Sequence, residues 1–101
     1  MLDKKQNEQM AENALAAEKM LKLLANQSRL RILCSLVDSP KPVNELEEMV
    51  DISQSALSQH LAKLRLAKIV NTEKRGQSVY YSLASVEVNA ILSTLYLIYC
   101  K

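Results

Sequence analysis

Hydrogen-bonding side chains gather near the middle of this 101-residue chain. Leu57, Leu61 and Leu64 recur there at spacings of three and four, which predicts an amphipathic helix over residues 52–65. Ser53 can act as the N-cap, so that the positive end of the helix could face a phosphate. The remaining positions suit base edges and phosphate oxygens, and they are Gln54, Ser55, Ser58, Gln59, His60 and Lys63.

An ordinary solvated helix of a small bundle can have the same pattern, and enzymatic interpretations are weaker still. Ser58 and His60 are two residues apart on a helix, so they do not face each other as a nucleophile and its base would. The chain has one glycine, which excludes the usual glycine-rich phosphate-binding loops. We expect no enzyme.

The neighbouring segments fit a helix that reads DNA. Residues 43–50 have their own helical spacing of apolar residues, and a short link around Asp51 joins them to the next helix, which is the helix-turn-helix arrangement. Residues 69–75 and 78–83 change to a period of two and are separated by Gly76 and Gln77, which predicts a hairpin with a tight turn. Its tip carries Lys74 and Arg75, and together with Gln77 they could contact DNA as a wing. An ordinary surface hairpin is the alternative.

The net charge of +2 is small, but basic residues are concentrated between positions 63 and 75. Glu73 is the one acidic residue there. Phosphate contacts from this segment would make DNA binding depend strongly on salt, although a short charge run can also be a solvated face. The basic residues are Lys63, Arg65, Lys68, Lys74 and Arg75.

The remaining pattern predicts a mainly α protein with a small β-hairpin, built as one domain over residues 1–101. We expect residues 1–8 to be disordered, and helices over residues 9–24, from an Asn26 N-cap to Asp38, and over 86–100 after a Ser85 cap. Pro42 can occupy the first turn of the helix that follows it. The last helix is apolar on more than one face, so we expect a homodimer that pairs through the first and last helices.

The chain lacks an apolar run of about 20 residues that could span a bilayer, and its first residues lack the apolar core of a signal peptide. These features favour a cytoplasmic protein. Its two cysteines then argue against a structural disulfide scaffold and leave buried thiols, a metal site or redox chemistry.

Two segments resemble the ArsR/SmtB family of bacterial transcriptional repressors. They are PVNELEEMVDISQSALSQHLAKLRLAKIVNTEKRGQSVYYSL and LLANQSRLRILCSL, the second of which is similar to the family pattern ALxxxxRLxIL. The resemblance covers residues 19–100, and the SQSALSQHL block is its most specific part. It implies a winged helix-turn-helix fold, a dimer and an operator DNA partner.

The resemblance also bears on the input signal. Metal-sensing relatives often carry Cys-x-Cys in the helix before the recognition helix, but residues 45–50 contain no cysteine. One histidine and two distant cysteines supply zinc ligands poorly, so we expect no metal and no other cofactor. Cys34 and Cys100 resemble the dithiol of the sulfur- and redox-sensing branch, the BigR-, SqrR- and HlyU-like regulators. Cys34 could equally be a small core residue.

Three hypotheses follow. The first is a homodimeric repressor whose operator binding is switched by thiol oxidation or persulfide at Cys34 and Cys100, with a reactive sulfur species or oxidant as the inducer. The second is a DNA-binding anti-silencer without a ligand, or a metal-responsive repressor. The third is a protein-interaction module that uses the Ser/Gln helix.

Overall fold

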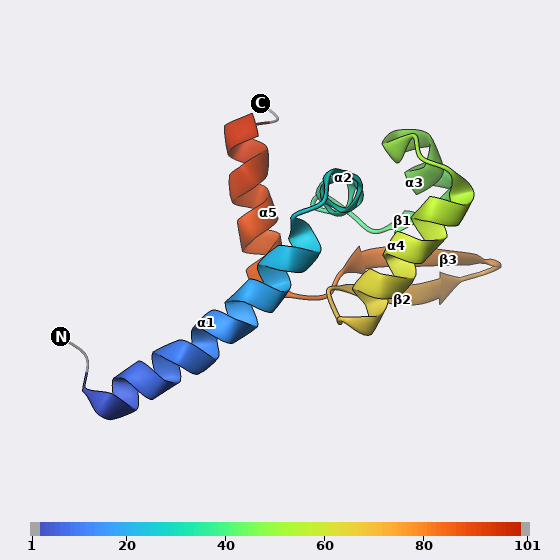
Figure 1. Cartoon of the computed structure of the whole chain (residues 1–101). Helices are drawn as coiled ribbons and strands as arrows, with labels where there is room; N and C mark the ends of the chain where they lie inside the picture. Colours follow the sequence, from blue (N-terminus) through green and yellow to red (C-terminus); the bar gives the residue numbers. More distant parts are fainter. Residues whose placement is uncertain (1–2, 100–101) are drawn as a thin grey trace.

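The computed structural model describes residues 3–99 (Figure 1). In chain order the elements are α1 (Lys4–Leu24), α2 (Gln27–Ser35), β1 (Lys41–Pro42), α3 (Val43–Val50), α4 (Gln54–Leu66), β2 (Val70–Arg75), β3 (Ser78–Leu83) and α5 (Val86–Tyr99). The strands form an antiparallel sheet in the order β1-β3-β2. Helices α3 and α4 make the helix-turn-helix, and β2 and β3 make the wing, so the predicted winged helix-turn-helix fold is confirmed.

The start of α1 corrects the expectation of disorder for residues 3–8. The helix begins at Lys4 because Asp3 and Gln6 form a reciprocal cap. The main-chain N–H of Gln6 donates to Asp3 Oδ1 at 2.8 Å, and the main-chain N–H of Asp3 donates to Gln6 Oε1 at 3.0 Å. These bonds satisfy N–H groups that a helix start otherwise leaves unpaired. Residues 1 and 2 lie outside the described part of the chain.

Helix α2 begins as predicted and ends earlier. The Asn26 side chain accepts a hydrogen bond from the Arg29 amide at 3.0 Å, which confirms the predicted N-cap. The helix ends at Ser35, not at Asp38, because the chain tightens into bonds that span three residues. The Leu36 amide donates to the Leu33 carbonyl, and the Val37 amide donates to the Cys34 carbonyl.

Strand β1 was not predicted, and it makes the expected two-stranded hairpin a three-stranded sheet. Lys41 pairs with Tyr81 and Pro42 pairs with Tyr80. Pro42 is therefore the N-cap of α3 and does not lie in its first turn. Lys41 is buried, and its Nζ lies 2.8 Å from Asp38 Oδ1. A strand of two residues has no periodicity that a sequence could display.

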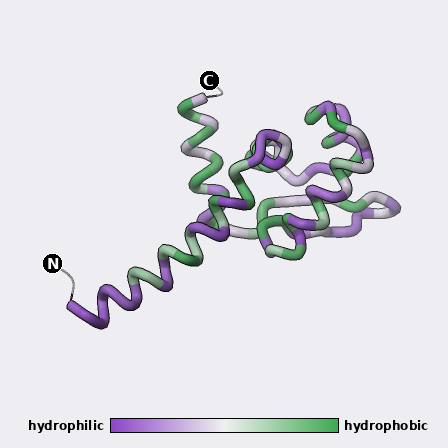
Figure 2. Tube along the Cα trace, viewed as in Figure 1, coloured by the Kyte–Doolittle hydropathy of each residue, from purple (hydrophilic) through white to green (hydrophobic). Residues whose placement is uncertain are grey.

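The core lies where α2, α3, α4 and α5 meet one face of the sheet. Most of α1 extends away from it, and within that helix only Leu24 is buried (Figure 1). Figure 2 shows that hydrophilic residues dominate the first part of α1, whereas hydrophobic residues are frequent along α5. The buried core residues are Leu24, Ile32, Leu33, Leu36, Leu46, Val50, Leu57, Leu61, Leu64, Ile69, Val70, Val88 and Leu92.

Candidate nucleic-acid interface

Helix α4 presents the polar face that the sequence predicts. The Ser53 hydroxyl accepts a hydrogen bond from the Ala56 amide at 3.1 Å, which confirms the predicted N-cap. Leu57, Leu61 and Leu64 are buried and fix the helix against the core. His60 is half-buried, and the remaining predicted DNA-contacting residues of the helix are exposed: Gln54, Ser55, Ser58, Gln59, Lys63 and Arg65.

The turn between α3 and α4 depends on one unusual backbone position. Asp51 has a φ of 57° and a ψ of 52°, which is the left-handed region that Asp and Asn tolerate better than most side chains. Its amide donates to the Glu47 carbonyl at 3.3 Å and ends α3. Leu46 and Val50 of α3 are buried, so the core holds both helices of the pair.

One flank of α4 faces the sheet across an open groove of about 510 Å³. Ser58 and Arg65 of the helix line this groove together with Tyr81 of β3. Leu66, at the end of α4, also lines it and is 85% exposed. The groove lies between α4 and the strands of the wing. The predicted contact residues Ser58 and Arg65 both lie on the flank of α4 that lines it.

The wing turns at Gly76, whose φ of +63° is a positive value that glycine adopts without steric cost. Lys74, Arg75 and Gln77 are all exposed near the tip. Arg75 has partners that the sequence did not indicate. Its guanidinium lies 4.6 Å from the centre of the Tyr80 ring, and its Nη2 lies 3.5 Å from a carboxylate oxygen of Glu73.

The opposite flank of α4 faces α2. His60 lies there, and burial is the main cause that lowers its pKa below the ordinary value; the positive charges of Arg29 and Lys63 lower it further. Arg29 also contacts the end of α1, because its Nε donates to the Leu23 carbonyl and its Nη2 donates to the Lys22 carbonyl at 3.3 Å. Arg29 of α2 is therefore bonded to the end of α1 and adds positive charge near His60 of α4.

Arg29 was absent from the predicted site. It is the first arginine of the LLANQSRLRILCSL segment, so the motif was visible in the sequence. Its spacing gave no indication that the guanidinium adds positive charge near His60.

Cys34 lies away from these basic residues, on the side of α2 that faces α5. It is half-buried and packs against the edge of the core. A hollow of about 290 Å³ lies beside it, and Leu95 and Tyr99 of α5 line the hollow together with Gln27, Leu30, Arg31 and Cys34 of α2. Cys100, the other predicted redox residue, lies outside the described residues.

Between residues 3 and 99, no group of three or more His, Cys, Asp or Glu side chains is arranged to hold a metal ion. Over the same residues, no helix is both long enough and apolar enough to cross a membrane.

Comparison with known proteins identifies the family. Residues 26–72 match the model described as "Bacterial regulatory protein, arsR family". The transcriptional activator HlyU of Vibrio cholerae is 47% identical over 94 residues, which are 93% of this chain and 87% of HlyU. The biofilm growth-associated repressor of Agrobacterium fabrum is 37% identical over 91 residues, which are 90% of this chain and 78% of the repressor.

Solved structures agree with this assignment. The structure of reduced HlyU from Vibrio cholerae has a TM-score of 0.88 at 47% identity, covering 92% of this chain and 98% of that one. The transcriptional repressor BigR from Xylella fastidiosa has a TM-score of 0.86 at 34% identity, covering 93% of each chain. The chain therefore belongs to the ArsR family of winged helix-turn-helix, DNA-binding transcriptional regulators.

Proposed function

We propose that this regulator is a homodimeric repressor whose operator binding is switched by oxidation or persulfide formation at Cys34 and Cys100. The observation that carries the proposal is the hollow that Cys34 shares with Tyr99. Tyr99 is the last described residue of α5, and Cys100 follows it directly in the sequence. A thiol on α2 therefore lies beside the helix whose next residue is the second thiol.

The DNA-reading face is the exposed polar surface of α4 with the wing beside it. Gln54, Ser55, Ser58 and Gln59 carry amides and hydroxyls that can bond to base edges in a major groove. The side chains of Lys63, Arg65, Lys74 and Arg75 supply positive charge for phosphates, while the imidazole of His60 and the amide of Gln77 can donate to phosphate oxygens. Two such faces in a dimer would read half-sites about one helical turn apart, or a multiple of it.

The apolar residues that α1 and α5 leave exposed support dimerisation through these helices. On α1, Met10, Leu15 and Leu21 are each more than half exposed. On α5, the side chains of Leu97 and Ile98 are 61% and 62% exposed. Exposed apolar surface of this extent favours burial against a second copy of the chain.

The chemistry needs no cofactor. In direct oxidation, the two thiols lose two electrons and two protons to an oxidant such as diamide or hydrogen peroxide, and an S–S bond forms between them. With a persulfide, one cysteine thiolate attacks the outer sulfur, becomes a protein persulfide and releases the donor as a thiol. The second cysteine then attacks the inner sulfur of this persulfide, forms the disulfide and releases hydrogen sulfide.

A link between the two cysteines would change how α2 and α5 pack. The charge of Arg29 on α2 acts on His60 of α4, so a shift of α2 would change the electrostatic environment of the recognition helix. A coupling of about 1–3 kcal/mol, or roughly 5- to 150-fold in affinity, would be enough for regulation. The relatives include both an activator and a repressor by name.

The test is intact-protein mass spectrometry after diamide, hydrogen peroxide or a persulfide donor, with the remaining thiols then blocked, alongside DNA binding to fragments of the genome. Loss of both thiols within one chain together with weaker DNA binding is the expected result. Cys34→Ser and Cys100→Ser should each bind DNA and no longer respond. A double serine variant that still releases DNA on oxidation would refute the switch.

DNA binding that ignores all three reagents, with both thiols unreacted, would favour the second candidate, a ligand-independent anti-silencer. The observation that supports this alternative is that Cys34 is half-buried and packs at the edge of the core, as a structural cysteine would. Metal added to the treated and untreated protein would test the metal-responsive repressor in the same assay.

A further inference from the structure

An arginine and a tyrosine of the wing meet on one face of the hairpin. In the register of β2 and β3, Glu73 lies opposite Tyr80 and Arg75 lies opposite Ser78. Side chains alternate between the two faces of a strand, so all four residues share one face, and Arg75 and Tyr80 are diagonal neighbours. The Arg75 guanidinium lies 4.6 Å from the centre of the Tyr80 ring, which is within the range of a cation–π contact.

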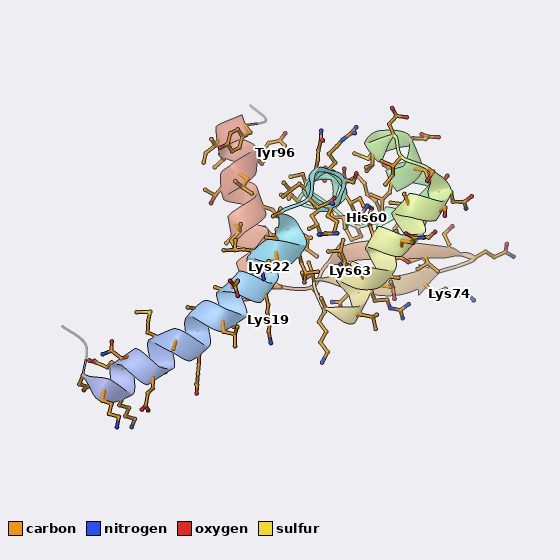
Figure 3. The ribbon with its side chains drawn as sticks, viewed as in Figure 1. Lys19, Lys22, His60, Lys63, Lys74 and Tyr96 are labelled. Carbon is orange, nitrogen blue, oxygen red and sulfur yellow. The ribbon has the colours of Figure 1, made fainter. Side chains whose placement is uncertain are left out.

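Lys74 lies on the other face of the same hairpin. It lies opposite Val79 and next to Arg75 in the sequence, so strand alternation turns its side chain away from the Tyr80 ring. Figure 3 shows Lys74 on the hairpin toward its tip. The wing therefore carries two exposed cations of equal charge, one stacked on an aromatic ring and one on the opposite face.

Tyr80 offers a fixed surface because it belongs to the middle strand of the sheet. Its neighbours are Pro42 of β1 on one side and Glu73 of β2 on the other, and Tyr80 is half-buried. Arg75 is the last residue of β2, an edge strand, and its side chain is 48% exposed. The ring therefore limits the rotamers of a side chain that solvent alone would leave free.

The stacked guanidinium keeps its edges available for a ligand. Stacking covers a face of the planar group, whereas its five N–H donors point outward in the plane and can bind a phosphate in pairs. The contact from Arg75 Nη2 to the Glu73 carboxylate at 3.5 Å joins side chains that are 48% and 68% exposed. An ion pair this exposed is weak and screened by salt, so a phosphate can replace the carboxylate while the ring contact remains.

We propose that Tyr80 is a positioning residue for DNA binding, which holds the Arg75 guanidinium in the orientation that contacts a backbone phosphate beside the wing. This role rests on the proposed contact of Arg75 with DNA. A long side chain loses conformational freedom when it binds, and a side chain that is already ordered loses less. Tyr80 thus contributes affinity without touching DNA, and it acts only through Arg75.

The test is a pair of double-mutant cycles, measured by fluorescence anisotropy with a labelled random-sequence duplex. Tyr80→Ile should weaken binding about threefold per subunit, or roughly tenfold per dimer, because that is the scale of the entropy lost in ordering one long side chain. The same substitution in an Arg75→Gln background should have little effect, since the ring then has no guanidinium to position. In a Lys74→Gln background it should keep its full effect, because Lys74 lies on the other face.

Tyr80→Phe is the matched control, because it keeps the stacking ring and removes only the hydroxyl. It should bind DNA within about twofold of the wild type. Arg75→Gln alone should flatten the slope of log affinity against log salt by about 0.9 per subunit, as the loss of one phosphate contact does. Isoleucine is a strong strand former, and Tyr80→Thr gives the same comparison if urea unfolding shows that Tyr80→Ile does not fold.

The cycles separate positioning from a structural role. An effect of Tyr80→Ile that disappears with Arg75→Gln, persists with Lys74→Gln and is absent in Tyr80→Phe supports the proposal. An equal effect in both backgrounds would show that Tyr80 acts through the fold of the whole wing, and would overturn it. Tighter DNA binding by Tyr80→Ile would also overturn it, because the ring would then compete with the phosphate for Arg75.

Two further results distinguish this proposal from the proposed function. If Arg75→Gln left both the affinity and the salt slope of a DNA-binding protein unchanged, the role of Tyr80 would be refuted and the reading surface of α4 would stand. A wild-type protein without salt-dependent DNA binding would overturn both the positioning role and the proposed DNA-reading face.

Discussion

Ser53 combines a structural role with a proposed DNA contact, and substitution can separate the two. Its hydroxyl accepts the Ala56 amide at 3.1 Å and caps α4. Ser53→Ala removes this acceptor and should lower the free energy of unfolding by about 1 kcal/mol. For a chain of this size the midpoint of thermal unfolding should fall by roughly 5 °C.

Ser53→Asp should keep the cap, because aspartate is as good an N-cap as serine and its charge is favourable at a helix start. The same charge would repel a phosphate at the end of α4. Two unit charges about 4 Å apart in water interact by about 1 kcal/mol. For two subunits this is about 2 kcal/mol, or about a 30-fold loss of DNA affinity.

The assays are thermal unfolding at fixed protein concentration and anisotropy with a labelled duplex, with Ser53→Thr as the control that retains the hydroxyl. The reasoning predicts that Ser53→Asp unfolds like the wild type but binds DNA much more weakly. If Ser53→Asp were as unstable as Ser53→Ala, the capping argument would be wrong. If it bound DNA as tightly as the wild type, the start of α4 would not face a phosphate.

Three further outcomes are expected. Burial, Arg29 and Lys63 lower the pKa of His60, and DNA phosphates nearby should raise this pKa again. DNA affinity measured by anisotropy should therefore rise as the pH falls toward about 5.5, and His60→Gln should lose this pH dependence. Gly76→Ala should cost about 1 kcal/mol in urea unfolding, from its positive φ alone, because an added Cβ meets nothing within 4 Å. The hydrogen bond from Lys41 lowers the pKa of Asp38 below its ordinary value of 3.8. The pair should therefore stabilise the fold fully at a pH above 3.8, and this stabilisation should be lost as the pH falls through the lowered pKa. Urea unfolding of Asp38→Asn should lack this pH dependence.

Local chemistry was sufficient to predict much of the structure. Asn26, Ser53 and Ser85 were recognised as N-caps because a cap needs only a short polar side chain before a helical pattern, and each accepts the expected amide. The leucines of α4 were recognised as a buried face because their spacing matches the helical period. The turn at Gly76 followed from the change of period on either side of it.

The capping box at Asp3 is local as well, because Asp3 and Gln6 alone form its two hydrogen bonds. Strand β1 is different. Lys41 and Pro42 form a strand only because β3, nearly forty residues later, offers its edge. No pattern within two residues can encode a partner that distant, so tertiary contacts alone decided this element.

The same distinction applies to the functional surface. The sequence by itself determined which residues of α4 and the wing are polar, basic and exposed, because the helical and strand periods assign faces without knowledge of the fold. Only the tertiary structure decided that Arg29 bonds to the end of α1 and adds positive charge near His60, that Arg75 packs on Tyr80, and that Cys34 shares a hollow with Tyr99. These contacts link elements separated along the chain or across the sheet, and their geometry is set by how the common core packs.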